Sequence, residues 1–195
     1  MSLRVWPRAR RWAGVGAMLA VLHLPVGSPA QASMPESVSR VEAAFLRNFA
    51  RYVTWPARAF ASERSPWVVC VLGGAHFDES LEKTFEGRTE QGRPFEVVRA
   101  SAPEKLPGCQ IVYVGYANSA MRRAALAEYK RQPVLTVGDA PEFLDEGGVV
   151  RLLARERIEM SINLDQARAA SLAIPAKMLE VSREVLENGT LRRGR

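Results

Sequence analysis

Few side chains in this sequence could carry out catalytic chemistry. Beyond the first 32 residues there is one histidine, His76, and two cysteines, Cys70 and Cys109. A Ser/His/Asp triad would have to recruit His76, yet no serine lies in a nucleophile-elbow sequence. A zinc site needs more ligands than one histidine and two widely separated cysteines. We therefore expect no metal site and no enzyme, and we assign His76 a capping or packing role.

Glycines follow three apolar segments that read as buried strands: CVLGG, VYVGY and LTVGD. If these strands are parallel, Gly73, Gly74, Gly115, Gly138 and Asp139 lie at the carboxyl edge of a sheet, where open α/β folds bind ligands. Tight strand-to-helix turns also need glycine whatever the function, and Asp139 also suits a helix cap. The sequence lacks G-x-G-x-x-G and P-loop motifs, so we expect no cofactor and keep these five residues as ligand-binding candidates.

Aromatic residues recur at helical spacing near the start of the same region. Phe45, Phe49, Tyr52 and Trp55 are three or four residues apart. They could fix a helix to the sheet, or they could form a contact surface, since aromatic residues are enriched in interface hot spots. Tyr52 and Trp55 are our candidates for partner binding.

Helical and strand patterns alternate along the part of the chain that would position these residues. We expect helices at 36–55, 76–87, 119–131, 140–148 and 175–186 and strands at 67–72, 95–98, 109–115, 134–139, 149–158 and 159–164, with a connection or strand tail at 165–170. The last two strands would form an antiparallel pair. This alternation predicts a single layered α/β domain with a mixed, largely parallel central sheet flanked by helices.

The first 32 residues have the layout of a cleaved signal peptide. Four arginines precede an apolar run at 12–24, and Ala30-Gln31-Ala32 supplies a small-residue cleavage pattern. The run is shorter than the roughly 20 residues that span a bilayer as a helix. An uncleaved membrane anchor is the alternative. We expect residues 1–32 to be removed, and a single domain at 33–195 to be exported.

Removing the leader changes the charge balance. The chain has 27 Lys and Arg against 21 Asp and Glu, and four of the arginines lie in residues 1–32, which leaves 23 against 21. This near-balance offers no electrostatic case for nucleic-acid binding, which needs a basic patch. We interpret the late cluster of Arg192, Arg193 and Arg195 as a solvated tail.

Export also changes how the cysteines are interpreted. Oxidising compartments favour disulfides, so Cys70 and Cys109 are expected to pair within the chain. A bridge across a loop of about 40 residues would stabilise the fold by roughly 3–4 kcal/mol in the chain-entropy model. Two buried free thiols and an intermolecular bridge are the alternatives.

Several segments together resemble the YfiR family. They are AAFLRNFARYVTWP, CVLG, CQIVYVG, PVLTVGD, FLDEGGVVRL and IEMSINLDQARAASLAIPAKMLEVSREV, in this order. Members of that family are small exported α/β domains without known catalytic residues. The best understood act in the periplasm, where they repress a membrane-bound diguanylate cyclase by binding its periplasmic sensor region, and dimers are usual.

The resemblance implies roles for the cysteines and for the whole chain. Cys70 and Cys109 match the positions of a family disulfide, whereas a second disulfide of the best-known member has no counterpart around GGVVRLL. The implied function is a non-enzymatic periplasmic repressor of a diguanylate cyclase, a homodimer that lowers cyclic di-GMP signalling. The alternative is a periplasmic small-ligand binding protein that uses the carboxyl edge of the sheet.

Overall fold

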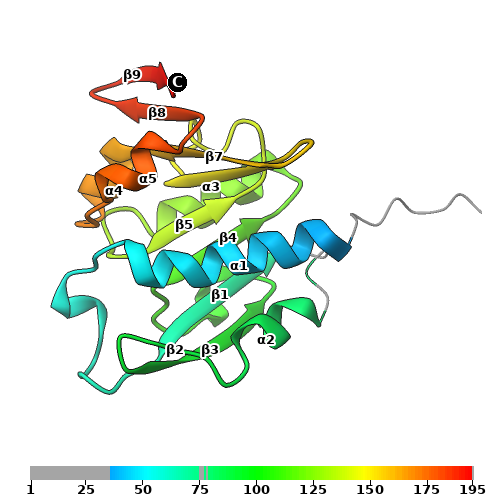
Figure 1. Cartoon of the computed structure of the whole chain (residues 1–195), viewed down its shortest axis with the longest axis vertical. Coiled ribbons are helices and arrows are strands. Elements are labelled where there is room, and N and C mark those ends of the chain that lie inside the picture. The colour runs from blue at the N-terminus through cyan, green and yellow to red at the C-terminus, as the bar shows by residue number, and fades with distance from the viewer. Residues whose placement is uncertain (1–35, 75–76, 78, 195) are drawn as a thin grey trace, which may run out of the picture. The chain divides into compact units, whose positions relative to one another are not determined.

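A mixed β-sheet runs through the middle of the domain (Figure 1). The structure is a computed structural model, and it describes residues 36–74, 77 and 79–194. Within these residues the sheet has nine strands in the order β2-β3-β1-β4-β5-β6-β7-β8-β9. The signal peptide predicted at 1–32 and His76 lie outside the described residues.

The elements have the following bounds. The strands are β1 (Trp67–Gly73), β2 (Thr89–Glu90), β3 (Arg93–Ala100), β4 (Ile111–Gly115), β5 (Leu135–Gly138), β6 (Val150–Ala154), β7 (Ile158–Asn163), β8 (Glu184–Glu187) and β9 (Thr190–Arg193). The helices are α1 (Glu36–Tyr52), α2 (Ser80–Phe85), α3 (Ser119–Glu128), α4 (Leu164–Ala169) and α5 (Ala176–Glu180), with short 3₁₀ turns η1 (Ala57–Ala59) and η2 (Pro103–Lys105).

The centre of the sheet is parallel and its margins are mixed. β3, β1, β4, β5 and β6 pair in parallel, with Val69 of β1 opposite both Val97 and Ile111. β7 is antiparallel to β6, β8 is parallel to β7, and β9 is antiparallel to β8. The predicted α/β domain with a mixed, largely parallel sheet is confirmed.

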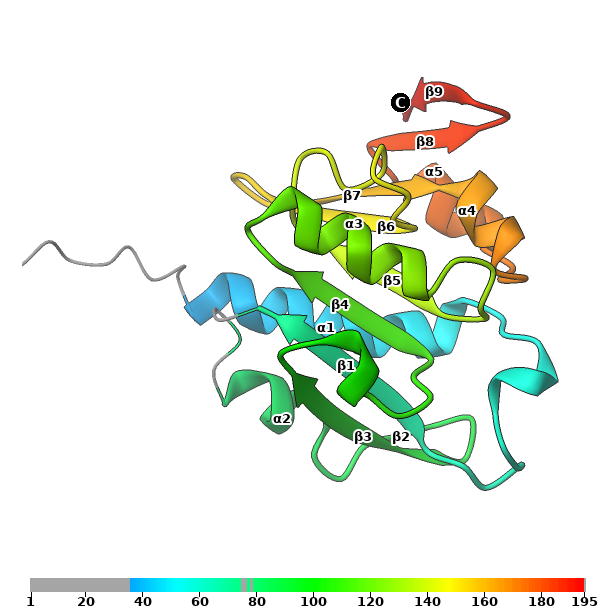
Figure 2. The same cartoon turned by 180° about the vertical axis from the view of Figure 1, so that it is seen from behind.

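Successive side chains of the central strands enter two separate apolar clusters. Val69 and Val71 pack in the cluster that contains the α1 residues Leu46 and Phe49. Cys70 belongs to the other cluster, which contains α3 residues. α1 and α3 accordingly cover opposite faces, as the two views show (Figures 1 and 2). Burial on both faces explains why these strands are continuous apolar runs.

Helix α1 follows its apolar periodicity closely. Its fully buried Ala43, Leu46 and Ala50 lie at three- and four-residue steps, which places them on one face. The helix ends at Tyr52, ahead of Pro56, which disfavours helical backbone in the residue before it. In the described residues no helix has the length and apolar character that crossing a membrane requires.

The C-terminal part of the sequence prediction was wrong. The helix expected at 175–186 ends at Glu180, and β8 and β9 follow it. Asn188 and Gly189, expected to end a helix, have φ angles of 53° and 69° and form the two-residue turn between β8 and β9. Arg192 and Arg193, expected in a solvated tail, are exposed but lie in β9.

Two shorter segments also differ from their predictions. Residues 140–148, expected as a short helix, form turns, and Gly147 has a φ of 100°. Residues 165–170, expected as a connection or strand tail, lie mostly in α4, whose first turn is capped by the Asn163 side chain. The cap explains the helix, because the Asn163 amide oxygen accepts a hydrogen bond from the otherwise unpaired Gln166 N–H.

Candidate functional site

The glycines at the ends of β1 and β4 bring two turns into contact. Gly73 lies opposite Gly115 in the sheet, and the Gly74 N–H donates to the Gly115 oxygen at 3.4 Å. A Cβ placed on Gly115 would lie 2.6 Å from the Gly74 nitrogen, and Gly73 has a φ of 71°. Glycine is required here because two backbone segments touch, so the space between the turns is occupied by protein.

Gly138 and Asp139, after β5, are engaged in the same way. A Cβ on Gly138 would lie 2.5 Å from the Phe143 ring. Asp139 accepts a hydrogen bond from the hydroxyl of buried Tyr113. Burial raises the pKa of Tyr113 well above its usual value, and the nearby carboxylates of Asp139 and Glu42 raise it further. The structure thus brings the five predicted ligand candidates to one edge of the sheet. There the glycine turns contact other backbone or the Phe143 ring, and Asp139 contacts Tyr113.

The two cysteines form a disulfide. Cys70 in β1 and Cys109, just before β4, have a Cα–Cα distance of 6.1 Å and are 39 positions apart in the sequence. Both are buried, at 0% and 6% exposed. The bridge joins two neighbouring strands, so neither sulfur is available as a thiolate nucleophile.

The two aromatic partner candidates have different surroundings. Tyr52, at the end of α1, is 49% exposed. Trp55 is 8% exposed, its indole N–H donates to the Gln110 carbonyl at 3.2 Å, and its ring contacts Trp67 edge-on at 5.0 Å. Tyr52 is therefore the one of the pair with a side chain free to meet another protein.

Gln110 is a buried polar residue that the sequence analysis did not single out. Its side-chain oxygen accepts from the Val68 N–H at 2.8 Å, and its side-chain nitrogen donates to the Ala59 carbonyl at 2.6 Å. Because Gln110 follows Cys109, these two hydrogen bonds connect η1 and the start of β1 to the segment that carries the disulfide. In the sequence it is only a polar residue preceding an apolar run, which gives no signal of this role.

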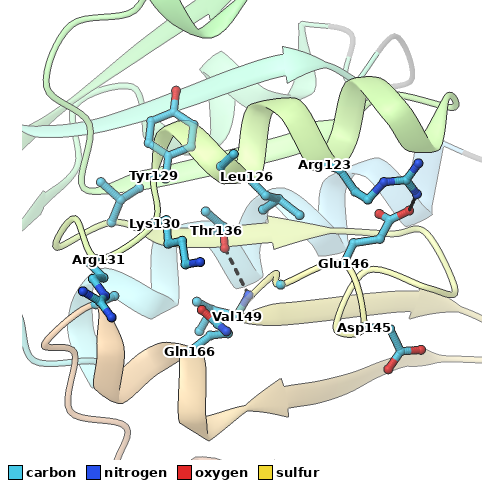
Figure 3. Close-up of a pocket in the computed structure, with 14 residues that line it drawn as sticks. Arg123, Leu126, Tyr129, Lys130, Arg131, Thr136, Asp145, Glu146, Val149 and Gln166 are labelled. Atoms are coloured by element: carbon cyan, nitrogen blue, oxygen red, sulfur yellow. Dashed lines mark hydrogen bonds and ion pairs between the residues drawn. The ribbon is translucent and has the colours of Figure 1, made fainter.

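A pocket of about 280 Å³ lies beside α3 (Figure 3). Its lining includes the cationic Arg123, Lys130 and Arg131 and the acidic Asp145 and Glu146. Thr136 in the floor accepts a hydrogen bond from the Val149 N–H at 3.0 Å, whereas the Tyr129 hydroxyl points away from the pocket in Figure 3. Burial raises the pKa of Tyr129 to about 12. The lining offers charges of both signs.

An ion pair fixes one wall of this pocket. The Arg122 guanidinium donates from Nε and Nη2 to both oxygens of Glu146, at 2.7 and 2.8 Å. The same guanidinium donates to the Tyr116 and Ala117 carbonyls, and the two paired side chains are 5% and 6% exposed. Arg122 thus joins α3 to the turn after β4 and to the loop between β5 and β6.

A larger groove, about 870 Å³, lies over the C-terminal strands β6 to β9. Side chains from four consecutive strands line it, including Arg151 of β6, Glu159 of β7, Glu184 of β8 and Leu191 of β9. Arg151 donates to Glu184 at 2.6 Å, and both side chains are largely buried. A largely buried ion pair therefore connects β6 to β8 on the face that lines this groove.

Within the described residues no three His, Cys, Asp or Glu side chains come together as a metal site would require. A family model described as YfiR/HmsC-like matches residues 39–183, well over half of the sequence. The chain belongs to the YfiR/HmsC-like family. The match confirms the resemblance seen in the sequence, and it ends one residue before β8, so the β8–β9 hairpin lies beyond it. A search of curated proteins found no match.

Proposed function

We propose that this protein is a non-enzymatic periplasmic regulator that binds the periplasmic sensor region of an inner-membrane diguanylate cyclase and represses it. The observation that carries the proposal is membership of the YfiR/HmsC-like family across residues 39–183. Repression of such a cyclase lowers the level of cyclic di-GMP.

The side chains that could carry out chemistry are bonded to other groups of the protein, which supports a binding role over catalysis. Cys70 and Cys109 are consumed in a disulfide, and Asp139 accepts a hydrogen bond from Tyr113. The charged pair Arg122 and Glu146 is satisfied within the protein. A regulator needs only a surface that distinguishes two states of its receptor. Binding represses if it favours the inactive state of the cyclase, because a ligand shifts an equilibrium only by its difference in affinity for the two states.

The direct test combines binding with a cellular readout. The periplasmic region of the cyclase, carrying a purification tag, should retain residues 33–195 on co-purification, and deletion of the regulator should raise cyclic di-GMP. A catalytically dead cyclase is the control, since deletion should then leave cyclic di-GMP unchanged. An unchanged level in the strain with the active cyclase would contradict the proposal.

Export and self-association are part of the same proposal. Intact mass of the protein recovered from the periplasm should correspond to a chain that starts near Ser33, with the disulfide formed. Retention of residues 1–32 in the membrane fraction would instead support the anchor. Sedimentation velocity should give the mass of a homodimer, and a monomer at micromolar concentration would contradict the proposed self-association.

The alternative of a small-ligand binding protein has less support. Its candidate site was the carboxyl edge of the sheet, where the turns holding Gly74 and Gly115 are in contact with each other. A thermal-shift screen tests it, because a ligand that binds the folded state raises the melting temperature by mass action. A saturable shift that Gly115→Ala abolishes would favour the alternative.

A further inference from the structure

β9 is an edge strand of the described sheet, whose side chains are exposed and whose backbone is unpaired on the side away from β8. Among the described strands it pairs only with β8. All four of its residues are exposed, and Leu191 is 51% exposed although its side chain is apolar. Proteins usually protect such edges, because a row of unpaired N–H and C=O groups is a template for another strand.

The register of the hairpin shows which backbone groups face outward. The Gly194 N–H donates to the Arg183 carbonyl at 2.7 Å, so this pair is hydrogen-bonded. Hydrogen-bonded and non-hydrogen-bonded pairs alternate in an antiparallel ladder. Leu191 and Arg193, opposite Leu186 and Glu184, are therefore in non-hydrogen-bonded pairs. Their N–H and C=O groups point away from β8, toward the open side.

Positive charge is concentrated beside this edge. The groove and β9 together present six arginines and three glutamates, a net charge of +3; they are Arg151, Arg155, Arg157, Arg183, Arg192, Arg193, Glu156, Glu159 and Glu184. The whole of residues 33–195 carries a net charge of +2. This one region is thus more positive than the expected mature chain as a whole.

Two of those arginines, Arg155 and Arg157, are placed to meet a partner. Glu184 contacts Arg151 at 2.6 Å and Arg193 at 3.9 Å, and Glu159 contacts Arg183 at 2.9 Å. Arg155 and Arg157 are exposed in the turn between β6 and β7, with Glu156 between them. Arg155 and Arg157 line the same groove as Leu191 of β9. An acidic segment that continues from the edge of β9 into this groove would meet these cations without displacing the internal ion pairs.

We propose that the β9 surface, defined as the outer edge of β9 at Leu191 and Arg193 together with Arg155 and Arg157, docks an extended acidic segment of the partner. The inference rests on the proposed function and names the cyclase's periplasmic region as the source of the segment. Main-chain hydrogen bonds to the edge of β9 supply affinity, as in other strand additions. The arginines select acidic side chains and accelerate encounter.

The test measures binding of the purified periplasmic region of the cyclase to residues 33–195 by calorimetry at two salt concentrations. Leu191→Pro removes an outward N–H and leaves the bonds to β8 in place, since proline is tolerated on edge strands. Arg155→Glu combined with Arg157→Glu reverses the charge. Each variant should weaken the Kd at least about tenfold, and the charge reversal should also reduce the salt dependence of binding.

A matched control reverses Arg64 and Arg88, which are exposed and lie in turns ahead of β1 and β2. It makes the same charge change and should leave the Kd within about twofold. Circular dichroism and intact mass check the fold and the disulfide. If Leu191→Pro fails to fold, the arginine variant alone decides.

The outcomes separate this inference from the proposed function. Wild-type binding with wild-type-like affinity in both β9 variants overturns the docking surface and leaves the proposed function standing. No binding of the wild type contradicts the proposed function, and the inference falls with it. Conversion of a dimer to a monomer with cyclase affinity unchanged assigns the surface to a second copy of this chain, which also overturns the inference.

Discussion

Strands β1, β4 and β5 are held by apolar side chains on both faces, whereas β6, β7 and β8 have one apolar face and one face lined by charged side chains. In the centre Val69, Ile111 and Leu135 are fully buried, and a disulfide joins β1 to the start of β4. At the C-terminal end Arg151 of β6 reaches across β7 to Glu184 of β8.

The difference separates two roles within one sheet. Turns in contact close the carboxyl edge of the centre, where a ligand site was expected, and a disulfide joins the same strands toward their opposite end. The charged end keeps an open groove and an unpaired strand edge. Polar side chains satisfy one another across the strands there and remain compatible with water, so this end can stay exposed until a partner covers it. If the centre is the rigid half of the sheet, removing its contacts should lower the free energy of unfolding more than removing contacts at the charged end.

The largest effect is expected from removing the disulfide in the centre. Cys70→Ser combined with Cys109→Ser should lower the free energy of unfolding by about 4 kcal/mol, because the bridge closes a long loop in the unfolded chain. Denaturant unfolding of both proteins, with and without reductant, measures it. Reductant should destabilise only the wild type. A difference under about 1 kcal/mol would show that the bridge does not rigidify the centre.

The next effect concerns the Arg122–Glu146 pair, which joins the central helix α3 to the loop leading to β6. Glu146→Gln should lower the free energy of unfolding by about 2–3 kcal/mol, because it leaves the Arg122 charge partly desolvated without its partner. Glu142→Gln is the matched control: Glu142 is 3.6 Å from Arg122 but 64% exposed. That control should change stability by under about 1 kcal/mol, and equal losses in the two variants would contradict the assignment.

The same contrast explains how much of the fold could be predicted. In the centre, strands buried on both faces leave unbroken apolar runs such as 67–72, and glycines mark their ends. The order of elements and the mixed parallel sheet follow from these local patterns. The pairing of Cys70 with Cys109 was also expected, since two cysteines in a chain predicted to be exported allow one internal bridge.

At the C-terminal end the determining contacts are distant in sequence. Apolar spacing at Met178, Leu179, Val181 and Val185 favoured one helix, yet Val185 is buried in β8 by pairing with β7. A four-residue strand is too short to show a clear alternation. The Asn-Gly turn was the available signal, because both residues adopt the positive φ that a two-residue hairpin needs.

The candidate site divides in the same way. The glycines were placed correctly at one edge, but a sequence cannot show that the turns holding Gly74 and Gly115 touch. Arg122 and Glu146 are separated by 24 positions, and Arg151 and Glu184 by 33. Exposed and buried arginines look alike in a sequence, so neither pair could be recognised before the fold was known.

A smaller effect is expected from filling the contact between the central turns. Gly115→Ala should destabilise by about 1–3 kcal/mol, because the added Cβ would meet the Gly74 backbone, which has no side-chain freedom to move aside. Gly108→Ala is the control, since no atom lies within 4 Å of a Cβ at that position. Thermal unfolding compares the two. Equal stability would show that the central turns are looser than their contact indicates.

The smallest effect is expected at the C-terminal end, where Asp165 of α4 holds the β8–β9 turn. Its carboxylate accepts from the Asn188 and Gly189 N–H groups, each at 2.9 Å. The hydrogen bond from Gly189, followed by that from Asn188, lowers the pKa of Asp165 below its usual value. A lowered folded-state pKa stabilises the hairpin above the unfolded pKa of about 3.9, and this stabilisation is lost as the pH falls through the folded value.

Amide hydrogen exchange at Asn188 and Gly189 measures this contribution directly. After correction for the intrinsic rate, protection should fall in the wild type as the pH is lowered below about 4, while amides of β1 keep theirs. Asp165→Asn should abolish that acid dependence, and Asp145→Asn, at an exposed aspartate in the turn after β5, should retain it. Loss of protection in β1 at the same pH would show that the hairpin and the centre open together, and the division of the sheet into a rigid and an adaptable half would then fail.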